Sequence, residues 1–208
     1  MSGRRGWLAA ILGLVLAGYA WSGIEPVGAS TWVMETIWVP AGLVVVAVSW
    51  RRFPLTTLLC VLLAVHAVAL AYGGHFGYAN TPLGDRVQDA LSLSRNPYDR
   101  FGHFLQGFVP AIAVREVLWH LTPLRGSRAL PLLTLCVCMA ISAWWELLEW
   151  AGAELTDSGN PAFLGGQGDP WDTQWDMLMA LIGALLSLAL LSRWHDHQLR
   201  RLVAATPQ

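Results

Sequence analysis

Six apolar stretches, each near the length of a membrane-spanning helix, dominate this 208-residue sequence. They cover residues 7–23, 31–50, 54–72, 101–121, 129–152 and 173–193. A helix needs about 20 residues to cross the hydrocarbon core, and open irregular backbone cannot satisfy its hydrogen bonds there. Only 13% of the residues are charged, about half the share in a typical soluble domain. The sequence therefore predicts an all-α membrane helix bundle with six transmembrane helices, forming a single membrane domain over residues 1–208.

Charged residues are unevenly divided between the two sides that these spans define. When the connections are assigned alternately, one side receives a single acid, Asp196, and nine arginines: Arg4, Arg5, Arg51, Arg52, Arg125, Arg128, Arg193, Arg200 and Arg201. The positive-inside rule predicts that this side, which includes both termini, is cytoplasmic. Because five further spans follow the first one, we expect the first to be an uncleaved signal anchor.

Two outer connections are long enough to carry structure of their own. In residues 73–100, Leu83, Val87 and Leu91 recur every four residues, which predicts a short amphipathic helix between the third and fourth spans that lies on the bilayer or caps the bundle. Residues 153–172 are rich in Gly, Pro, Asn and Asp, which predicts an ordered loop built from turns.

Polar side chains gather at the outer ends of three spans. Asp99, His103 and Gln106 share one helix face at the start of the fourth span, and Glu146 and Glu149 lie three apart near the end of the fifth. Asp169, Asp172 and Asp176 follow a similar spacing at the start of the sixth span. Since these segments face the same side of the membrane, we expect the three groups to meet.

This collection of carboxylates and one imidazole has two interpretations. It fits a divalent metal such as Mg, Mn, Ca or Zn, with candidate ligands His103, Glu146, Glu149, Asp172 and Asp176, and with Asp99 and Asp169 also possible. Alternatively, Arg95 and Arg100 neutralise some of the acids, and the residues form a hydrogen-bond and salt-bridge network that ties helix ends together.

Other polar residues lie along the spans. Arg115 and Glu116 are about 20 Å along the fourth helix from its outer end, and we expect them to pair on the cytoplasmic side, with Arg125 or Arg128 among the candidate partners. Glu35 lies one turn into the second span, where it joins the outer group or extends to water.

The inventory of residues excludes several classes of function. The chain has no lysine, which excludes Schiff-base and P-loop chemistry. Cys60, Cys136 and Cys138 all lie in apolar runs, which argues against a disulfide framework or a zinc knuckle. Nothing in the composition indicates nucleic-acid binding.

Residues 75–176 carry several longer motifs. They include His75-Phe76-Gly77-Tyr78-Ala79, the run from Tyr98 to Pro110, Glu146-Leu147-Leu148-Glu149-Trp150 and the run from Phe163 to Met177. These segments resemble the YjdF-type family of bacterial inner-membrane proteins, which implies a multi-pass plasma-membrane location. The chain is more distantly similar to VanZ-like membrane proteins, associated with glycopeptide resistance, although Ala180 stands where that group often has asparagine. Neither resemblance implies a reaction.

The interpretation we favour is chemistry at the outer surface, on the headgroup of an envelope lipid or a lipid-linked phosphate. Glu146 or Glu149 would be the general base, and the candidate substrate-binding residues are Arg95, Arg100, Gln106, Gln167 and Gln174. The expected partners are membrane lipids and a lipid-linked substrate. Two alternatives remain open, namely a divalent-cation transporter or sensor and a noncatalytic membrane assembly factor.

Overall fold

The computed structural model describes residues 2–50, 52–155 and 167–205, and every regular element in these ranges is helical. This confirms the predicted all-α class for the part of the chain described. In chain order the elements are α1 (Ser2–Ser22), α2 (Ala29–Thr36), α3 (Trp38–Ser49), α4 (Thr57–Phe76), the 3-10 turn η1 (Tyr78–Asn80), α5 (Pro82–Leu91), α6 (Tyr98–Leu121), α7 (Ala129–Leu155) and α8 (Asp172–Ala205).

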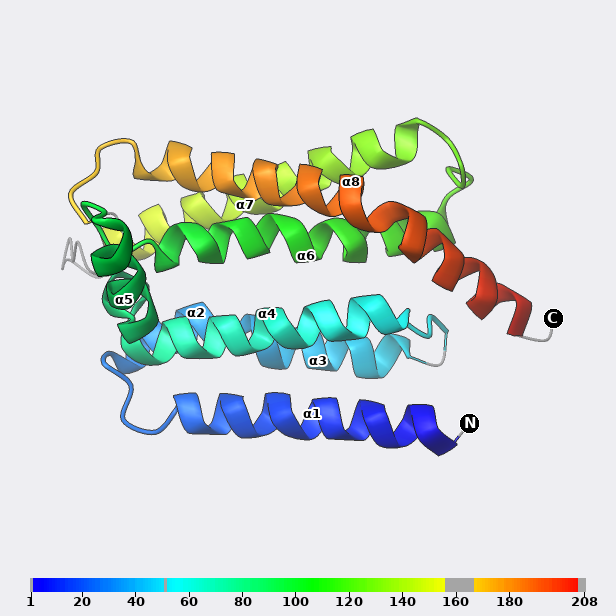
Figure 1. Ribbon diagram of the computed structural model, residues 1–208, viewed down its shortest axis with the longest axis horizontal. Coiled ribbons are helices and arrows are strands. Elements are labelled where there is room, and N and C mark those ends of the chain that lie inside the picture. Colours follow the sequence, from blue (N-terminus) through cyan, green and yellow to red (C-terminus); the bar gives the residue numbers. More distant parts are fainter. Residues whose placement is uncertain (1, 51, 156–166, 206–208) are drawn as a thin grey trace.

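The long helices run along a common axis (Figure 1). One end of the molecule, which we call the site end, carries α5, the α1–α2 connection and the first turns of α6 and α8. The opposite end, which we call the terminal end, carries the start of α1, the end of α8 and the α3–α4 and α6–α7 connections. The start of the first helix and the end of the last helix thus lie at the same end, as expected for an even number of passes, whereas the membrane side that each end faces stays a prediction.

Four segments are long and apolar enough to cross a membrane: Ala29–Ser49, Thr57–Phe76, Ala129–Glu154 and Asp172–Ala204. The apolar part of α1, Gly6–Ser22, is shorter. Helix α6 has 24 residues, but it carries polar side chains at both of its ends. The structure therefore supports a multi-pass membrane protein. That the chain crosses the membrane six times remains a prediction.

The second span, expected as one helix over residues 31–50, is divided into α2 and α3 at Ile37. Pro40 explains the break, because it has no N–H to donate to the carbonyl of Thr36 four residues earlier. The side chain of Thr36 in turn donates to the carbonyl of Trp32 at 2.7 Å. The division places Glu35, at the end of α2, at the site end of the bundle.

The last helix extends well beyond its expected end at residue 193, since α8 continues to Ala205. Hydropathy falls at Arg193, but one face of the following segment remains buried against the bundle. His195 and Leu199 have no exposed surface, and Leu199 packs with Trp119 and Leu130. Helix packing therefore continues where the apolar sequence stops.

The amphipathic segment between the third and fourth spans is observed as α5. Thr81 caps its start, accepting a hydrogen bond from the N–H of Gly84 at 3.3 Å, and Pro82 occupies the first turn. Leu83, Val87 and Leu91 are all exposed, so this apolar face is open to a bilayer surface. Of the loop predicted over residues 153–172, residues 156–166 lie outside the described part of the chain.

Helices α6 and α8 cross at backbone contact. A Cβ atom on Gly107 would lie 1.8 Å from the carbonyl oxygen of Ala180, and one on Gly183 would lie 2.1 Å from the carbonyl oxygen of Phe104. Small residues at such crossings let membrane helices approach closely and gain van der Waals contact. This crossing holds the first turns of α6 and α8 side by side at the site end.

Candidate functional site

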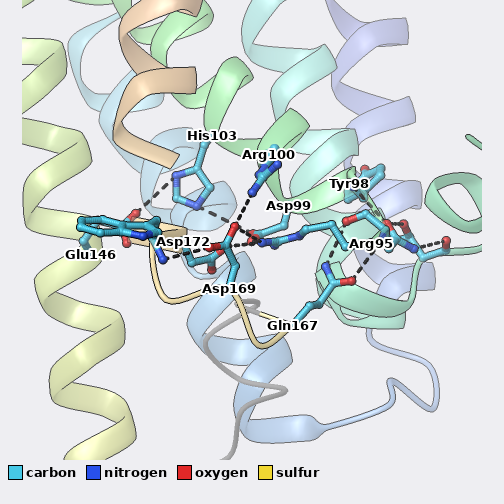
Figure 2. Close-up of polar contacts among 12 residues, drawn as sticks. Arg95, Tyr98, Asp99, Arg100, His103, Glu146, Gln167, Asp169 and Asp172 are labelled. Carbon is cyan, nitrogen blue, oxygen red and sulfur yellow. Dashed lines mark hydrogen bonds and ion pairs between the residues drawn. The ribbon is translucent and has the colours of Figure 1, made fainter. Parts of the chain in front are cut away.

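Three helix ends converge at the site end (Figure 2). Asp99 and His103 come from the first turns of α6, Glu146 from the second half of α7, and Asp172 and Asp176 from the start of α8. The three polar groups that the sequence placed on different spans therefore contribute to one cluster.

Asp99, His103 and Asp176 form a group with metal-ligand spacing within the described residues. Each offers one ligand atom, and these atoms all lie within 4.8 Å of one another. All three side chains are buried, and His103 Nε2 is 3.8 Å from Asp99 Oδ1. Ligand atoms that each lie about 2.0–2.5 Å from one ion are at most about 4–5 Å apart. The spacing is therefore compatible with a single divalent ion.

Gln106 orients the imidazole of His103. Its Oε1 atom lies 3.2 Å from His103 Nδ1, and because an amide oxygen can only accept, Nδ1 carries the proton. The lone pair of Nε2, on the side of Asp99, is then available to a metal. Metal-binding histidines usually donate their second ring N–H to such an acceptor. Gln106 thus contacts a candidate metal ligand, and its role in binding substrate stays a prediction.

Within the described part of the chain, two buried carboxylate oxygens of the cluster have no hydrogen-bond partner. They are Asp176 Oδ1 and Glu146 Oε1, and these two residues are 2% and 8% exposed, respectively. Glu146 Oε1 lies 3.6 Å from His103 Nδ1, but that nitrogen donates to Gln106. A buried carboxylate without compensation costs several kcal/mol. A cation or a hydrogen-bond donor bound here would remove that cost.

The arginines neutralise the acids that lie nearest to the loop. Arg95 forms an ion pair with Asp172, and its guanidinium is 3.4 Å from Asp99 Oδ2 and 3.8 Å from Asp169 Oδ2. Arg100 Nη2 donates to Asp169 Oδ2 at 2.7 Å. The structure therefore places Asp169 and Asp172 in ion pairs with arginine and leaves Asp176 on the side of His103.

Gln167 and Asn96 join the segments before α8 and α6. Asn96 N donates to Gln167 Oε1 at 3.0 Å, and Gln167 Nε2 donates to the Asn96 carbonyl at 3.0 Å. The Asn96 amide also donates to Asp85 Oδ1 at 2.8 Å, and a Cβ on Gly84 would lie 1.8 Å from Asn96 Oδ1. Gln167, predicted to bind substrate, thus positions the entry to α8, while α5 packs on the same asparagine.

Tyr78 borders the site on the side of α4. Its ring lies between Gly73 and Gly102, where added Cβ atoms would lie 2.6 and 2.8 Å from ring carbons. Burial, followed by the charge of Glu35, raises the pKa of Tyr78 well above its usual value, so the hydroxyl keeps its proton. Glu35 itself is buried at the end of α2.

The remaining predicted residues lie around this cluster. Glu149 has a side-chain hydrogen bond with Trp145 and interacts electrostatically with Glu146 and Glu35, but it is outside the Asp99–His103–Asp176 group. Gln174 is exposed. Sequence reasoning gave Asp99 only a secondary place among the ligands, although its four-residue spacing from His103 was the signal that identifies it.

A second polar cluster, which we call the terminal-end network, contains Arg115 and Glu116 together with partners that the sequence did not predict. Glu116 Oε1 accepts from Thr56 N at 2.9 Å, and Glu116 Oε2 lies 2.8 Å from His195 Nε2. Arg115 lies 3.0 Å from His195 Nδ1 and 2.6 Å from Asp196 Oδ1. Arg115 and Glu116 therefore pair with α8 and with the start of α4, which corrects the expectation of partners at Arg125 or Arg128.

The protonation of His195 follows from these contacts. A guanidinium can only donate, so Nδ1 accepts from Arg115 and the proton is on Nε2, where it is donated to Glu116. The imidazole is neutral and both of its nitrogens are used. The sequence indicated this network only through the position of polar residues along α6 and α8, which lie at the same distance from the terminal end.

Comparisons with known proteins cover nearly the whole chain. The profile of a family described as predicted membrane protein (DUF2238) matches residues 7–197. The chain is 46% identical over 181 residues to a protein described as inner membrane protein YjdF from Escherichia coli (strain K12), covering 87% of each chain. No solved structure matches the chain. The matched range includes every residue of both polar clusters.

Proposed function

Because the chain belongs to the DUF2238 family of predicted membrane proteins, we propose that it is a six-span inner-membrane protein whose site end faces the periplasm and binds a divalent metal. Its inner-membrane location follows from its similarity to the inner membrane protein YjdF and from its apolar helices. The resemblance to the YjdF-type family implied the same location. We further propose that it hydrolyses or transfers the phosphate-bearing headgroup of an envelope lipid. The observation that carries this proposal is the buried Asp99–His103–Asp176 group.

The donor set supports a resident metal. Two carboxylates and one imidazole suit Mg, Mn, Ca or Zn, because these ions accept hard oxygen ligands together with nitrogen. The unpartnered Oδ1 of Asp176 supports the same conclusion, since a buried anionic oxygen without a donor is expensive unless a cation compensates it. Three protein ligands would leave coordination positions for water and for a substrate oxygen.

The protein groups have distinct roles in this reaction. Asp99, His103 and Asp176 would hold a divalent ion, which would supply Lewis-acid activation of a phosphoryl oxygen and of water. Glu146, whose Oε1 is unpartnered, accepts the proton of the attacking water. Arg100, whose side chain is 28% exposed, binds a phosphate oxygen. A new oxygen–phosphorus bond forms, the bond to the leaving oxygen breaks, and Glu146 returns its proton to that oxygen.

The distribution of polar residues along α6 favours surface chemistry over transport. Between His103 and Arg115, the only polar side chain of α6 is Gln106, at the site end. The 12 positions that separate the two residues span about 18 Å. A transporter needs polar contacts for its ion across the membrane. The terminal-end network is also closed by its own ion pairs and hydrogen bonds.

Metal retention tests the proposal directly. Full-length protein purified in detergent without chelators should carry one divalent metal per chain, measured by elemental mass spectrometry. His103→Ala and Asp176→Asn should each lower the retained metal by at least about tenfold, and the double variant should add little, because the two residues serve one site.

The exposed residues His197 and Asp89 supply matched controls. His197→Ala and Asp89→Asn remove the same groups elsewhere and should retain the metal fully. Wild-type protein that carries no stoichiometric metal, and gains no thermal stability from Mg, Mn, Ca or Zn, would contradict the metal site and favour the arginine–carboxylate network.

A further inference from the structure

A largely apolar cavity of about 660 Å³ adjoins the candidate site. Its walls come from α2, α3, α4, η1, α6 and α7. Its polar lining residues are Glu35, His66, Tyr78, His103 and Gln106, apart from the indole N–H groups of its tryptophans. Cavities of about 300–1,000 Å³ are the usual size for sites that hold small organic ligands. The cavity therefore has the volume of a binding site, and one of its lining residues belongs to the proposed metal group.

The cavity opens sideways, toward the lipid. Val137, Ile141 and Trp144 of α7 line it and are also exposed on the surface of the bundle. Across from them, Trp38 of α3 is exposed and packs edge to face against Trp145 of α7, with ring centroids 5.9 Å apart, so this contact bounds the opening at its site end. The exposed lining residues thus form a mouth between α3 and α7.

The depth of the cavity matches one leaflet. Its lining along α6 runs from Gly102 to Pro110, and along α7 from Val137 to Trp145. Each interval spans eight residue steps, about 12 Å of helix. One leaflet contributes about 15 Å of hydrocarbon, half of the bilayer core. A chain that enters at this mouth can lie along the helices with its end near the middle of the membrane.

The polar lining residues determine what kind of molecule fits. Glu35 and His103 are buried side chains, 7% and 4% exposed, so an alkyl chain that filled the whole cavity would place hydrocarbon against them. That is unfavourable for both groups. An amphiphile satisfies both parts of the lining, because its tail contacts the α7 residues and its polar head reaches His103.

We propose that this cavity, here called the tail cavity, holds one hydrocarbon chain of a phosphate-bearing lipid whose headgroup lies beside His103. The inference rests on the proposed function and specifies its substrate as a membrane lipid that enters laterally, rather than a phosphate compound from the aqueous phase.

Photolabelling of the full-length protein tests the tail cavity. The protein is reconstituted in vesicles of phosphatidylethanolamine and phosphatidylglycerol that contain a trace of phosphatidylglycerol with a diazirine at the end of one acyl chain. We expect labelling of α7 between Val137 and Ile141 that exceeds labelling of the exposed surface around Ala189 in α8. A diacylglycerol with the same diazirine chain and no phosphate should label α7 about tenfold less, which corresponds to 1.4 kcal/mol.

Two variants narrow the cavity without touching the metal group. Ala140→Phe places a ring at an exposed position of the lining, and Val137→Trp does so one turn earlier. Both should lose α7 labelling while they retain metal. Ala189→Phe is the matched control, since Ala189 is exposed on α8 outside the cavity lining, and its labelling should equal that of the wild type.

Three outcomes would overturn the inference. Equal labelling by the phosphate lipid and by diacylglycerol would mean that bulk lipid fills the cavity. Undiminished labelling in both narrowed variants would place the chain elsewhere. Stabilisation by inorganic phosphate without lipid labelling would indicate a water-soluble substrate. By contrast, phosphate-dependent labelling in a protein that holds no metal would uphold the tail cavity and contradict only the proposed chemistry.

Discussion

At the scale of single residues, Asp176 lies in surroundings that are unfavourable for an acid. Its carboxylate is buried, one of its oxygens has no hydrogen-bond partner, and other carboxylates surround it. Arg95 is the basic group that partly offsets this repulsion. A residue selected only for stability would not be an acid here.

We therefore predict that Asp176→Asn stabilises the metal-free protein. Asparagine keeps the shape of the side chain but removes one negative charge from the cluster, which should add about 1–3 kcal/mol to the free energy of unfolding. Thermal unfolding in a chelator measures this effect. Asp89→Asn, at an exposed position of α5, should leave the midpoint unchanged. A lower midpoint for Asp176→Asn would contradict the stated repulsion.

At the scale of elements, the α6–α8 crossing is the contact on which the site geometry depends. Gly107→Ala would place a methyl group 1.8 Å from a backbone oxygen of α8, and backbone cannot yield as a flexible side chain can. We predict a loss of more than about 2 kcal/mol in stability, together with weaker metal retention.

Gly42 in α3 provides the matched control for that substitution. Apart from the adjacent turns of its own helix, no atom of the described residues lies within 4 Å of a Cβ added there, so Gly42→Ala should be neutral or stabilise the protein by up to about 1 kcal/mol. Thermal unfolding of both variants in the same detergent separates the close approach from a general effect of replacing glycine. Equal midpoints would show that α6 and α8 can separate freely.

The terminal-end network joins α4, α6 and α8 far from the site. His195→Ala removes the shared partner of Arg115 and Glu116, which would leave buried charges less well compensated. We predict a loss of about 3–5 kcal/mol in stability. Metal content per folded chain should not change, because the network lies at the opposite end of the bundle. His197→Ala, at an exposed position, should have no effect on either measurement.

The two polar clusters also show which interactions sequence can predict. Asp99 and His103 share one helix face because they are four residues apart, so their proximity follows from helical geometry alone. The Arg95–Asp172 pair spans 77 residues and the His195–Glu116 pair spans 79. Such pairs depend on how helices rotate and pack, and residue spacing carries no information about that. Spacing alone therefore could not show that Asp172 pairs with Arg95, and its role as a metal ligand stays a prediction.

The same distinction applies to helix boundaries. Apolar length predicted α6 and α7 within a few residues, because both helices begin or end where charged segments interrupt the hydrophobic sequence. The length of α8 could not be predicted in this way, since the polar segment after residue 193 stays helical through its contacts with α6.

At the scale of the whole molecule, the orientation in the membrane determines which compartment the site serves. Asp89 in α5 and Arg128 before α7 are both exposed and lie at opposite ends of the bundle. In a background without Cys60, Cys136 and Cys138, Asp89→Cys should react with an impermeant thiol reagent from the periplasmic side, whereas Arg128→Cys should react only after the membrane is opened. The reverse pattern would place the acidic site in the cytoplasm.

The continuity of α8 gives the molecule a mechanical link between its two polar clusters. Gly183 marks the crossing with α6, about 10 Å along the helix from Asp176 and about 18 Å from His195. If α8 tilts about that crossing, its terminal-end arm moves roughly 1.7 times as far as its site-end arm, and in the opposite direction. A displacement of Asp176 would thereby reach the terminal end of the bundle enlarged.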